Sequence, residues 1–544
     1  MNFAGVSRTV AGCLGCAAII LLSGCASAPR QPMLPLDQTL APLSVPAGYG
    51  LAVIRVDAAL SRKVQTIMRW QRLSFMAAND GTTPDLGAEH TGYSTFIKPL
   101  PPGTHQLQSL SSGFIRTQAG KQIIGQSFIN FLAAPRVFTI KAGEISDLGT
   151  LAIAEEPVSP PAGLSPANAA KIPSKAYVMQ LDSHAAEAEQ MLSIIQAKAP
   201  ALKMHQGSSW VSPVGESRLS RPELRQGLSA QLLSAKESGG QTYAGEAWGQ
   251  VRVRQAGRWA WLDTGLSHDI SAVDVLEDGR LLAGGSLGII RAKSPVSNEW
   301  QTWRLPFPDG VVKSIGHSAA LGIVVGVQNG DQLVVVQTPS LGEPWREMKR
   351  FNAFGSVQTD LLTSVASNGF TAIVVETSFT TTAKIHHYSL ATQQWSEQAL
   401  PTNFAGIPGA YTLSRDGRVF TTSGSPMFSQ NLRVSDDGGK TWTAGSSPQW
   451  MTWLTMVGDN RGYAVRQDSS SSPTPASLWK TSDGARSWLK TGPLPGSVSA
   501  LIAGRVVMAR IVVMGERELA LITPDNKLYV SRDEGASWTA DTFE

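Results

Sequence analysis

Tryptophan recurs at near-regular spacing over the C-terminal part of the chain, and this period constrains the fold more than any other feature. Successive positions lie 42 to 50 residues apart, and they are Trp259, Trp303, Trp345, Trp395, Trp442, Trp488 and Trp538. A period of about 40 to 50 residues built of strands is typical of β-propeller blades rather than of helical solenoids. Four short strands fit the unit 270–306, where Asp278-Gly279 is a hairpin signal. The sequence therefore predicts seven blades over residues 225–544, with six as the alternative because the third unit aligns less cleanly.

The composition favours an all-β protein of more than one domain. The chain has 544 residues, more than one hydrophobic core usually organises. Charged residues make up 16% of it, and 52 glycines and 32 prolines indicate many turns. The net charge is +4 without a basic run, which argues against a nucleic-acid partner.

The N-terminus, "MNFAGVSRTVAGCLGCAAIILLSGCAS", indicates an export signal. Its apolar run is short and interrupted by glycine, so it suits a cleaved leader better than a membrane span. The junction Leu22-Ser23-Gly24-Cys25 resembles the lipobox of bacterial lipoproteins. That resemblance implies a signal peptide over residues 1–24 and a mature protein anchored by lipid, including palmitate, on Cys25. A leftover cysteine could otherwise be a pairing or reactive thiol.

The residues after Cys25 favour the outer membrane. Ala26 and Ser27 follow the cysteine, and the aspartate that marks inner-membrane retention in the enterobacterial pattern is absent from this position. Cys13 and Cys16 lie in the leader, so the mature protein is expected to hold no disulfide. Residues 25–46 are rich in proline, which is typical of an extended tether.

Residues 47–155 contain short alternating runs separated by turn residues, which predicts a β-sandwich. The phrases "PLPPGTHQL" and "FTIKAGEISDLGTLAI" are similar to prealbumin-like sandwiches. His105 is expected to be a structural or exposed histidine rather than a metal ligand. Residues 156–224 are predicted to be a linker that contains one amphipathic helix, 183–199, and we expect this helix to pack against an adjacent domain rather than to bind a partner.

Three copies of an eight-residue pattern, "SDDGGKTW", "TSDGARSW" and "SRDEGASW", fall at the predicted junctions between third and fourth strands. They are similar to the Asp-box, or BNR repeat, S-x-D-x-G-x-[ST]-W. Ala485 replaces the glycine in the middle copy. The matching residues are Ser435, Asp437, Gly439, Thr441 and Trp442; Asp483, Ser487 and Trp488; and Ser531, Asp533, Gly535, Ser537 and Trp538.

The residue types of the box suit a structural turn. A short carboxylate can accept several backbone N–H bonds, glycine tolerates a positive φ, and the indole covers apolar surface. One carboxylate in each loop falls short of the oxygen ligands that calcium needs. We therefore expect these turns to be structural staples at the blade rims, with no metal and no cofactor.

Asp-box propellers include sialidases, photosystem II assembly factors and sortilin-type receptors, so the resemblance allows a glycosidase or a binding platform. Sialidases use three arginines, one in an [FY]-R-I-P motif, and a Tyr with a neighbouring Glu. The nearest phrase is "WRLP", whose tryptophan register places Arg304 on an outer strand. The carboxylates Asp269, Asp274 and Glu376 are scattered in the sequence. His386 and His387 adjoin in a predicted strand, which turns them to opposite faces, and an exposed histidine is the expected reading.

These observations predict a non-catalytic outer-membrane lipoprotein, a scaffold that binds an envelope protein or a glycan through its propeller. The lipid on Cys25 would hold it to the membrane. The alternatives are a sialidase-like glycoside hydrolase and a polysaccharide-binding module.

Overall fold

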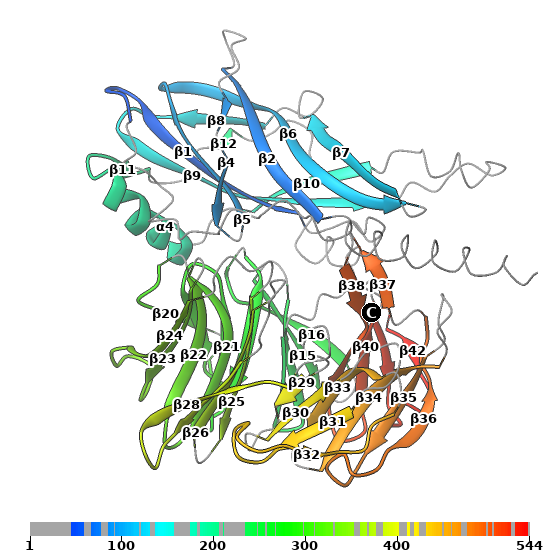
Figure 1. Ribbon diagram of the computed structural model, residues 1–544. Helices are drawn as coiled ribbons and strands as arrows, with labels where there is room; N and C mark the ends of the chain where they lie inside the picture. Colours follow the sequence, from blue (N-terminus) through cyan, green and yellow to red (C-terminus); the bar gives the residue numbers. More distant parts are fainter. Residues whose placement is uncertain are drawn as a thin grey trace, which may run out of the picture. The chain divides into compact units, whose positions relative to one another are not determined.

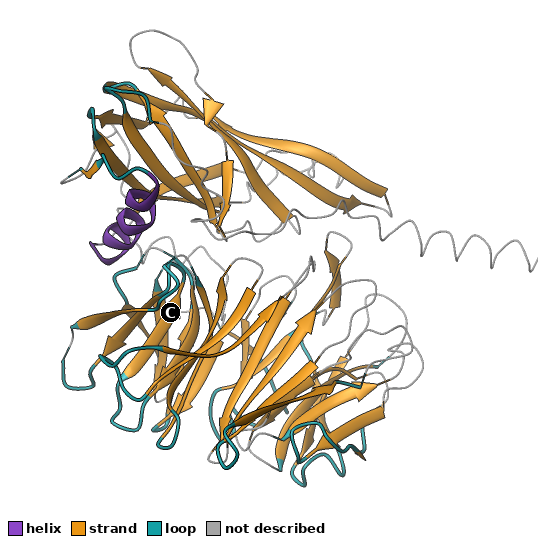
Figure 2. Ribbon diagram, turned by 60° about the vertical axis from the view of Figure 1, so that its left-hand side comes forward, coloured by secondary structure: helices purple, strands orange, loops and turns teal. Residues whose placement is uncertain are grey.

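The structure is a computed structural model that describes residues 45–541 apart from internal gaps. The longer gaps are 59–66, 78–84, 131–135, 157–174, 212–233, 353–358, 377–383, 402–410, 424–430 and 469–475. The predicted signal peptide, Cys25 and nearly all of the predicted tether lie outside the described residues. Within the described part, α4 (Ala185–Lys198) is the single helix and the remaining elements are strands (Figure 2).

The first part of the chain forms two six-stranded sheets, as expected for a sandwich. The strands of the first are β1 (Gly50–Ala58), β4 (Ala88–Thr91), β5 (Tyr93–Leu100), β9 (Glu144–Glu156), β10 (Lys175–Leu181) and β11 (Lys203–Met204). The strands of the second are β2 (Ile67–Ala77), β3 (Asp85–Leu86), β6 (Gly103–Gln118), β7 (Lys121–Asn130), β8 (Arg136–Ile140) and β12 (Trp210–Val211). The two sheets adjoin where β8 meets β1 and β9 and where β2 meets β4 and β5.

The range 156–224, which we predicted to be a linker, contributes strands to both sheets. β10 runs antiparallel to β9, and β11 pairs with the same strand in parallel. β12 pairs with β8 in the second sheet. These pairings complete sheet edges that would otherwise present unpaired backbone groups.

The helix α4 packs through an apolar face, as the sequence pattern indicates. Met191, Ile194 and Ile195 are buried in one cluster with core residues of β1 and of the first blades. Gln190 Nε2 donates to Pro308 O at 3.0 Å. Glu187 is fully buried and accepts a hydrogen bond of 2.7 Å from His268 Nδ1, a contact that the sequence pattern does not signal.

Seven four-stranded antiparallel sheets follow, so the seven-bladed propeller is confirmed and the six-bladed alternative is wrong (Figure 1). Blades 1 to 3 are β13 (Ser234–Ser238), β14 (Gln241–Gly245), β15 (Gln250–Gln255) and β16 (Arg258–Asp263); β17 (Ile270–Val275), β18 (Leu281–Gly285), β19 (Ile289–Lys293) and β20 (Trp300–Arg304); and β21 (Val311–Ser318), β22 (Gly322–Asn329), β23 (Gln332–Thr338) and β24 (Arg346–Asn352).

The remaining four blades follow the same order. They are β25 (Thr359–Ala366), β26 (Gly369–Glu376), β27 (Lys384–Ser389) and β28 (Gln394–Ala399); β29 (Tyr411–Leu413), β30 (Val419–Ser423), β31 (Asn431–Ser435) and β32 (Thr443–Ala444); β33 (Met451–Val457), β34 (Arg461–Gln467), β35 (Ala476–Thr481) and β36 (Leu489–Pro493); and β39 (Arg510–Val513), β40 (Leu519–Ile522), β41 (Leu528–Ser531) and β42 (Thr539–Ala540). The hairpin of β37 (Ser499–Ile502) and β38 (Arg505–Met508) lies between blades 6 and 7 in the chain.

The first strand of each blade adjoins the first strand of the next, which makes these strands the inner ones around the hub. The repeating tryptophan stands in or just before the fourth strand of every blade. Indoles of this set pack in the apolar clusters between blades, as Trp303 and Trp345 do between blades 2 and 3. The period therefore reports one indole for each blade.

The ring closes by side-chain and core contacts between blades 1 and 7, because each blade is one continuous segment of chain. Ala244 of β14 packs with Ala520 and Ile522 of β40. Arg254 Nε donates to Glu518 at 2.9 Å, and Trp259 Nε1 donates to Asp541 at 2.6 Å. No strand is exchanged between the first and last blades in the described residues.

Candidate functional site

The three Asp-box turns lie between the third and fourth strands of blades 5, 6 and 7. In blade 5, Asp437 accepts hydrogen bonds from Thr441 N at 2.9 Å, from Thr441 Oγ1 at 2.7 Å and from Ser435 Oγ at 2.8 Å. Asp483 and Asp533 accept corresponding bonds from Ser487 and Ser537, at 2.9 Å from each backbone N–H and 2.6 Å from each hydroxyl. Each carboxylate thus satisfies the donors of its own loop.

Backbone conformation and packing in the boxes explain their small residues. Gly439 and Gly535 both have φ of +90°, and Ala485 keeps a left-handed φ of +65° in the middle copy. A Cβ on Gly535 would lie 2.0 Å from Leu478 Cδ2 of the preceding blade. Trp488 Nε1 donates to Ser446 O, which follows blade 5, at 2.7 Å. The boxes therefore join neighbouring blades and do not converge on one cleft.

The hydrogen bonds in the boxes stabilise ionised carboxylates. Bonds from Ser487 hold the pKa of Asp483 at about 2, and bonds from Ser537 do the same for the pKa of Asp533. Burial by itself would raise the pKa of Asp437, but the bonds from Thr441 and Ser435 outweigh it and lower this pKa to about 2 as well. All three values lie below the ordinary pKa of 3.8.

We expect the boxes to make the propeller acid-sensitive in a defined range. Because the three carboxylates have a lower pKa in the folded than in the unfolded chain, their contribution is present above the unfolded value and is lost as pH falls from about 4 to about 2. The unfolding midpoint of the wild type should fall more steeply across this range than that of a variant with all three aspartates changed to asparagine. Parallel curves would contradict the prediction.

A charged cluster occupies one end of the hub. Asp274 of β17 has no exposed surface, and its carboxylate lies 2.7 Å from Lys236 Nζ of β13. His317 of β21 donates from Nδ1 to the same carboxylate at 2.7 Å. The three residues stand near the carboxyl ends of the inner strands of blades 1, 2 and 3. We call Lys236, Asp274 and His317 the hub cluster.

The hub cluster holds a buried anion between two basic groups. A fully buried carboxylate is stable only when it is paired, so Asp274 fixes the ends of three inner strands relative to one another. The Lys236 and His317 side chains remain 35% and 17% exposed. The cluster therefore presents ordered nitrogen groups to solvent. The sequence contains no spacing signal for it beyond the blade period itself.

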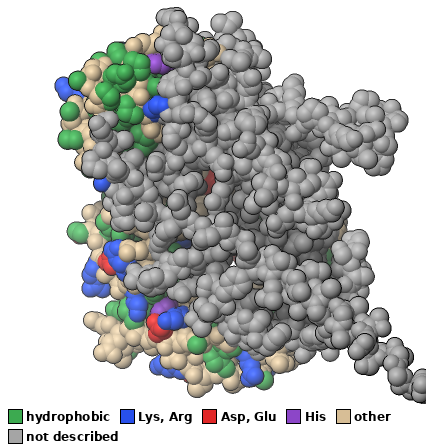
Figure 3. All heavy atoms as spheres, turned by 45° about the horizontal axis from the view of Figure 1, so that its top comes forward, with side chains coloured by type: hydrophobic (Ala, Val, Ile, Leu, Met, Phe, Trp, Pro, Cys, Tyr) green, Lys and Arg blue, Asp and Glu red, His purple; other side chains and the backbone are tan. Residues whose placement is uncertain are grey.

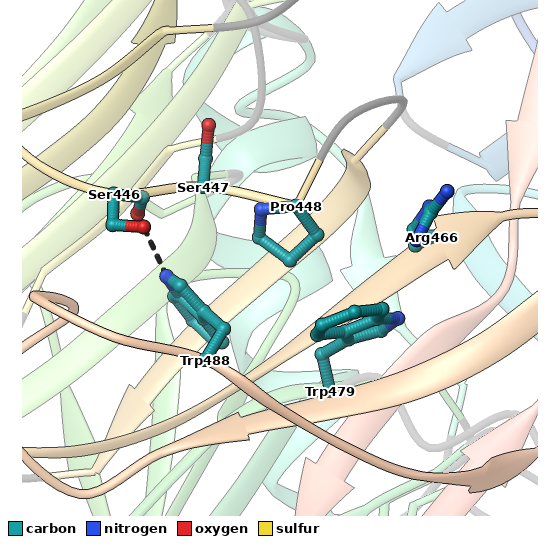
Figure 4. Close-up of a pocket in the computed structure, with 6 residues that line it drawn as sticks. All are labelled: Ser446, Ser447, Pro448, Arg466, Trp479 and Trp488. Atoms are coloured by element: carbon teal, nitrogen blue, oxygen red, sulfur yellow. Dashed lines mark hydrogen bonds between the residues drawn. The ribbon is translucent and has the colours of Figure 1, made fainter.

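An open pocket of about 280 Å³ lies between blades 5 and 6 (Figure 4). On one side are Ser446, Ser447 and Pro448, which follow β32, and on the other are Arg466 of β34, Trp479 of β35 and Trp488. The Arg466 guanidinium lies 5.3 Å from the Trp479 ring centroid. Of these residues, sequence reasoning found Trp488 as a box residue and missed the others.

The other candidate residues do not come together with the hub cluster. Asp269 precedes β17, and Glu376 ends β26 in blade 4. Arg304 ends the outer strand β20, as its register predicted, and pairs with Glu189 of α4. His105 is buried, its Nε2 donates to Pro101 O at 2.7 Å and its ring stacks on Phe138, consistent with a structural residue.

The expectation of an exposed histidine at 386–387 is wrong. His386 is buried against Phe351 of blade 3, with ring centroids 4.4 Å apart, and burial lowers its pKa to about 4. His387 is half-buried, contacts Thr371 Oγ1 at 3.0 Å and faces the side of Gly438 in blade 5. The two rings therefore point to opposite faces, as the strand period predicted.

Three further findings concern metal binding, membrane spans and surface charge in the described residues. No group of three or more His, Cys, Asp or Glu side chains among them is arranged to bind a metal ion. No helix in the described part of the chain has the length and apolar character needed to cross a bilayer. On the face drawn in Figure 3, the described acidic side chains at the lower left lie next to basic ones.

Comparisons with known proteins identify other β-propellers. No family model matches the chain, and no curated protein does. Among solved structures, an ulvan lyase of a polysaccharide lyase family is 11% identical, with a TM-score of 0.36, over 56% of this chain and 93% of its own. YCF48 bound to D1 peptide is 12% identical, with a TM-score of 0.35, over 56% and 86%. Virginiamycin B lyase from Staphylococcus aureus is 12% identical, with a TM-score of 0.36, over 56% and 92%.

Proposed function

We propose that the protein is a non-catalytic lipoprotein of the bacterial outer membrane whose propeller binds a protein partner. The observation that carries this proposal is the hub cluster, in which residues from three blades are paired before any partner arrives. Paired side chains lose little conformational freedom on binding, and such preorganisation favours affinity. The partner would contact the face on which the inner strands end.

That face also carries charged turns next to the hub. The turn between β17 and β18 exposes Glu277 and Asp278, and Arg280 pairs with Asp278 at 2.6 Å. In blade 7, the turn between β39 and β40 exposes Glu516 and Arg517. Interspersed charges of both signs suit recognition of a protein surface, because they penalise wrong partners more than they add to affinity.

A photo-crosslinking amino acid tests where the partner binds. Placed at Glu277, beside the hub, it should capture one envelope protein in whole cells. Placed at Val296, which is 94% exposed on the β19–β20 turn of the same blade and farther from the hub, it should not. Equal capture at both positions, or capture at neither, would overturn a hub-centred interface.

A sialidase would need a different set of residues at the hub. It needs three convergent arginines and a Tyr-Glu pair, whereas the described hub cluster consists of a lysine, an aspartate and a histidine. This composition supports binding over glycoside hydrolysis. Turnover of a fluorogenic sialoside by the purified protein would count against the non-catalytic proposal.

The lipid anchor has its own test. We expect Cys25→Ser to release the protein from the membrane fraction and to abolish the mobility difference between precursor and mature form, because this variant lacks the thiol that receives the lipid. Several acyl chains at about 0.8 kcal/mol per buried methylene make attachment lasting. Cell fractionation and gel mobility measure both effects. A variant that stays membrane-bound with unchanged mobility would remove the lipoprotein from the proposal.

A further inference from the structure

The pocket between blades 5 and 6 has two indole walls whose polar atoms are already engaged. Trp488 Nε1 donates to Ser446 O at 2.7 Å, and Trp479 Nε1 donates to Ser477 Oγ at 3.0 Å. These bonds fix the ring orientations. The apolar ring faces of Trp479 and Trp488 therefore remain available to contact a ligand.

Arg466, in this pocket, is a cation that has no counter-ion among the described residues. Its Nε atom is buried and has no hydrogen-bond partner, and within the described part of the chain no carboxylate pairs with its guanidinium. The buried Arg254, by contrast, has Glu518 and Asp541 as partners. Stacking on Trp479 offsets part of the desolvation of Arg466 but supplies no acceptor. An unpaired, partly desolvated guanidinium favours an incoming anion.

These pocket residues are specific to blade 6 rather than imposed by the repeat. In each boxed blade, the first residue of the box pairs with a residue of the second strand, and these pairs align the three blades with one another. The pairs are Thr481 with Gly462, Ser531 with Leu519, and Ser435 with Val419. The position four residues after the second-strand partner is Arg466 in blade 6. The equivalent positions are Thr523 in blade 7 and Ser423 in blade 5. The position two residues before the box is Trp479 in blade 6, Tyr529 in blade 7 and Arg433 in blade 5. The Arg–Trp pair thus has no structural counterpart in the other two boxed blades.

We propose that this pocket binds a hexuronic acid residue of an acidic polysaccharide. The sugar carboxylate pairs with Arg466, the C–H face of the pyranose ring lies on the indoles, and a ring hydroxyl reaches Ser446. A volume of about 280 Å³ lies just below the usual range for drug-sized ligands and suits one sugar ring. An aspartate or glutamate side chain of a peptide could reach Arg466, but it has no flat apolar face to cover two indoles.

The test measures binding of oligogalacturonate to the full chain by calorimetry and by quenching of tryptophan fluorescence. The neutral counterpart, an oligoglucoside of equal length, should bind about ten- to a hundredfold more weakly, because it lacks the charge-assisted hydrogen bonds to arginine. Added salt should weaken the oligogalacturonate complex. N-acetylglutamate and inorganic phosphate serve as the other anions, and binding of either as tight as that of the oligogalacturonate would overturn the sugar assignment.

Two arginines of the same strand provide the matched variants. Arg466→Gln should reduce oligogalacturonate affinity about ten- to a hundredfold without lowering the unfolding midpoint, since it removes a charge that no described residue pairs with. Arg461→Gln, at the other end of β34, should leave affinity unchanged. Equal losses in the two variants, or no binding by the wild type, would overturn the proposal. The crosslink from position 277 lies on blade 2 and should persist in Arg466→Gln, so the two proposals fail separately.

Discussion

Gly249→Ala is expected to lower the free energy of unfolding of the propeller by about 2–5 kcal/mol. Gly249 has a φ of +69°, and a Cβ there would lie 1.8 Å from the carbonyl oxygen of Leu266. A left-handed alanine costs about 1–2 kcal/mol, and forcing the packed backbone apart adds about 1–3 kcal/mol. The movement would also disturb the bond from Gly249 N to His268 O, 2.6 Å long. Denaturant unfolding followed by tryptophan fluorescence measures the loss.

Gly240→Ala is the matched control, because Gly240 is in the same blade. Its φ is +74°, but a Cβ there would meet no atom within 4 Å. We expect this variant to lose about 1–2 kcal/mol from backbone strain alone. If the two alanine variants were equally stable, the close approach of Gly249 to Leu266 would not affect the free energy of unfolding, and the prediction would be wrong.

The second large effect is expected at the junction of blades 1 and 7. Arg254 is 4% exposed, donates to Glu518 through two nitrogens, lies 3.6 Å from Asp541 and stacks 5.1 Å from the Trp259 centroid. Removing one partner of a buried pair costs about 3–5 kcal/mol, and the partial exposure of both acids reduces this figure. We therefore expect Arg254→Ala to destabilise the ring by about 2–4 kcal/mol, measured by denaturant unfolding.

An exposed pair within one blade provides the comparison. Lys384 Nζ lies 2.6 Å from Glu397, and both side chains are more than 40% exposed. Lys384→Ala should cost less than about 1 kcal/mol. A loss as large as that of Arg254→Ala would show that burial at the ring junction does not decide the energy.

The sequence predicted the propeller because its signal is repeated. Seven indoles at similar intervals specify the blades, and the third unit, which aligned less cleanly, still forms the four strands β21 to β24. The predicted linker was harder to interpret. β10 reads as an isolated apolar run, and its partner β9 precedes it across residues 157–174, so local patterns could not reveal the pairing.

The candidate sites were less predictable because they depend on residues far apart in the chain. His317 and Asp274 are separated by 43 positions, and only the alignment of inner strands brings them together. Asp274 was singled out as a carboxylate, but its two basic partners were not. Arg466 gave no signal, because what distinguishes it is that no described residue pairs with it, and a sequence does not show which charges are paired.

Because every blade is one continuous segment, the contacts between neighbouring blades join parts of the chain that are close in sequence. The contact between blades 1 and 7 is different. It joins residues separated by 264 and 282 positions, as in Arg254–Glu518 and Trp259–Asp541. The entropic cost of loop closure is therefore largest for this junction, and its contacts are the least local in the propeller. Six blades can assemble in the order in which the ribosome delivers them, and the native ring must wait for the strands of blade 7, β39 to β42.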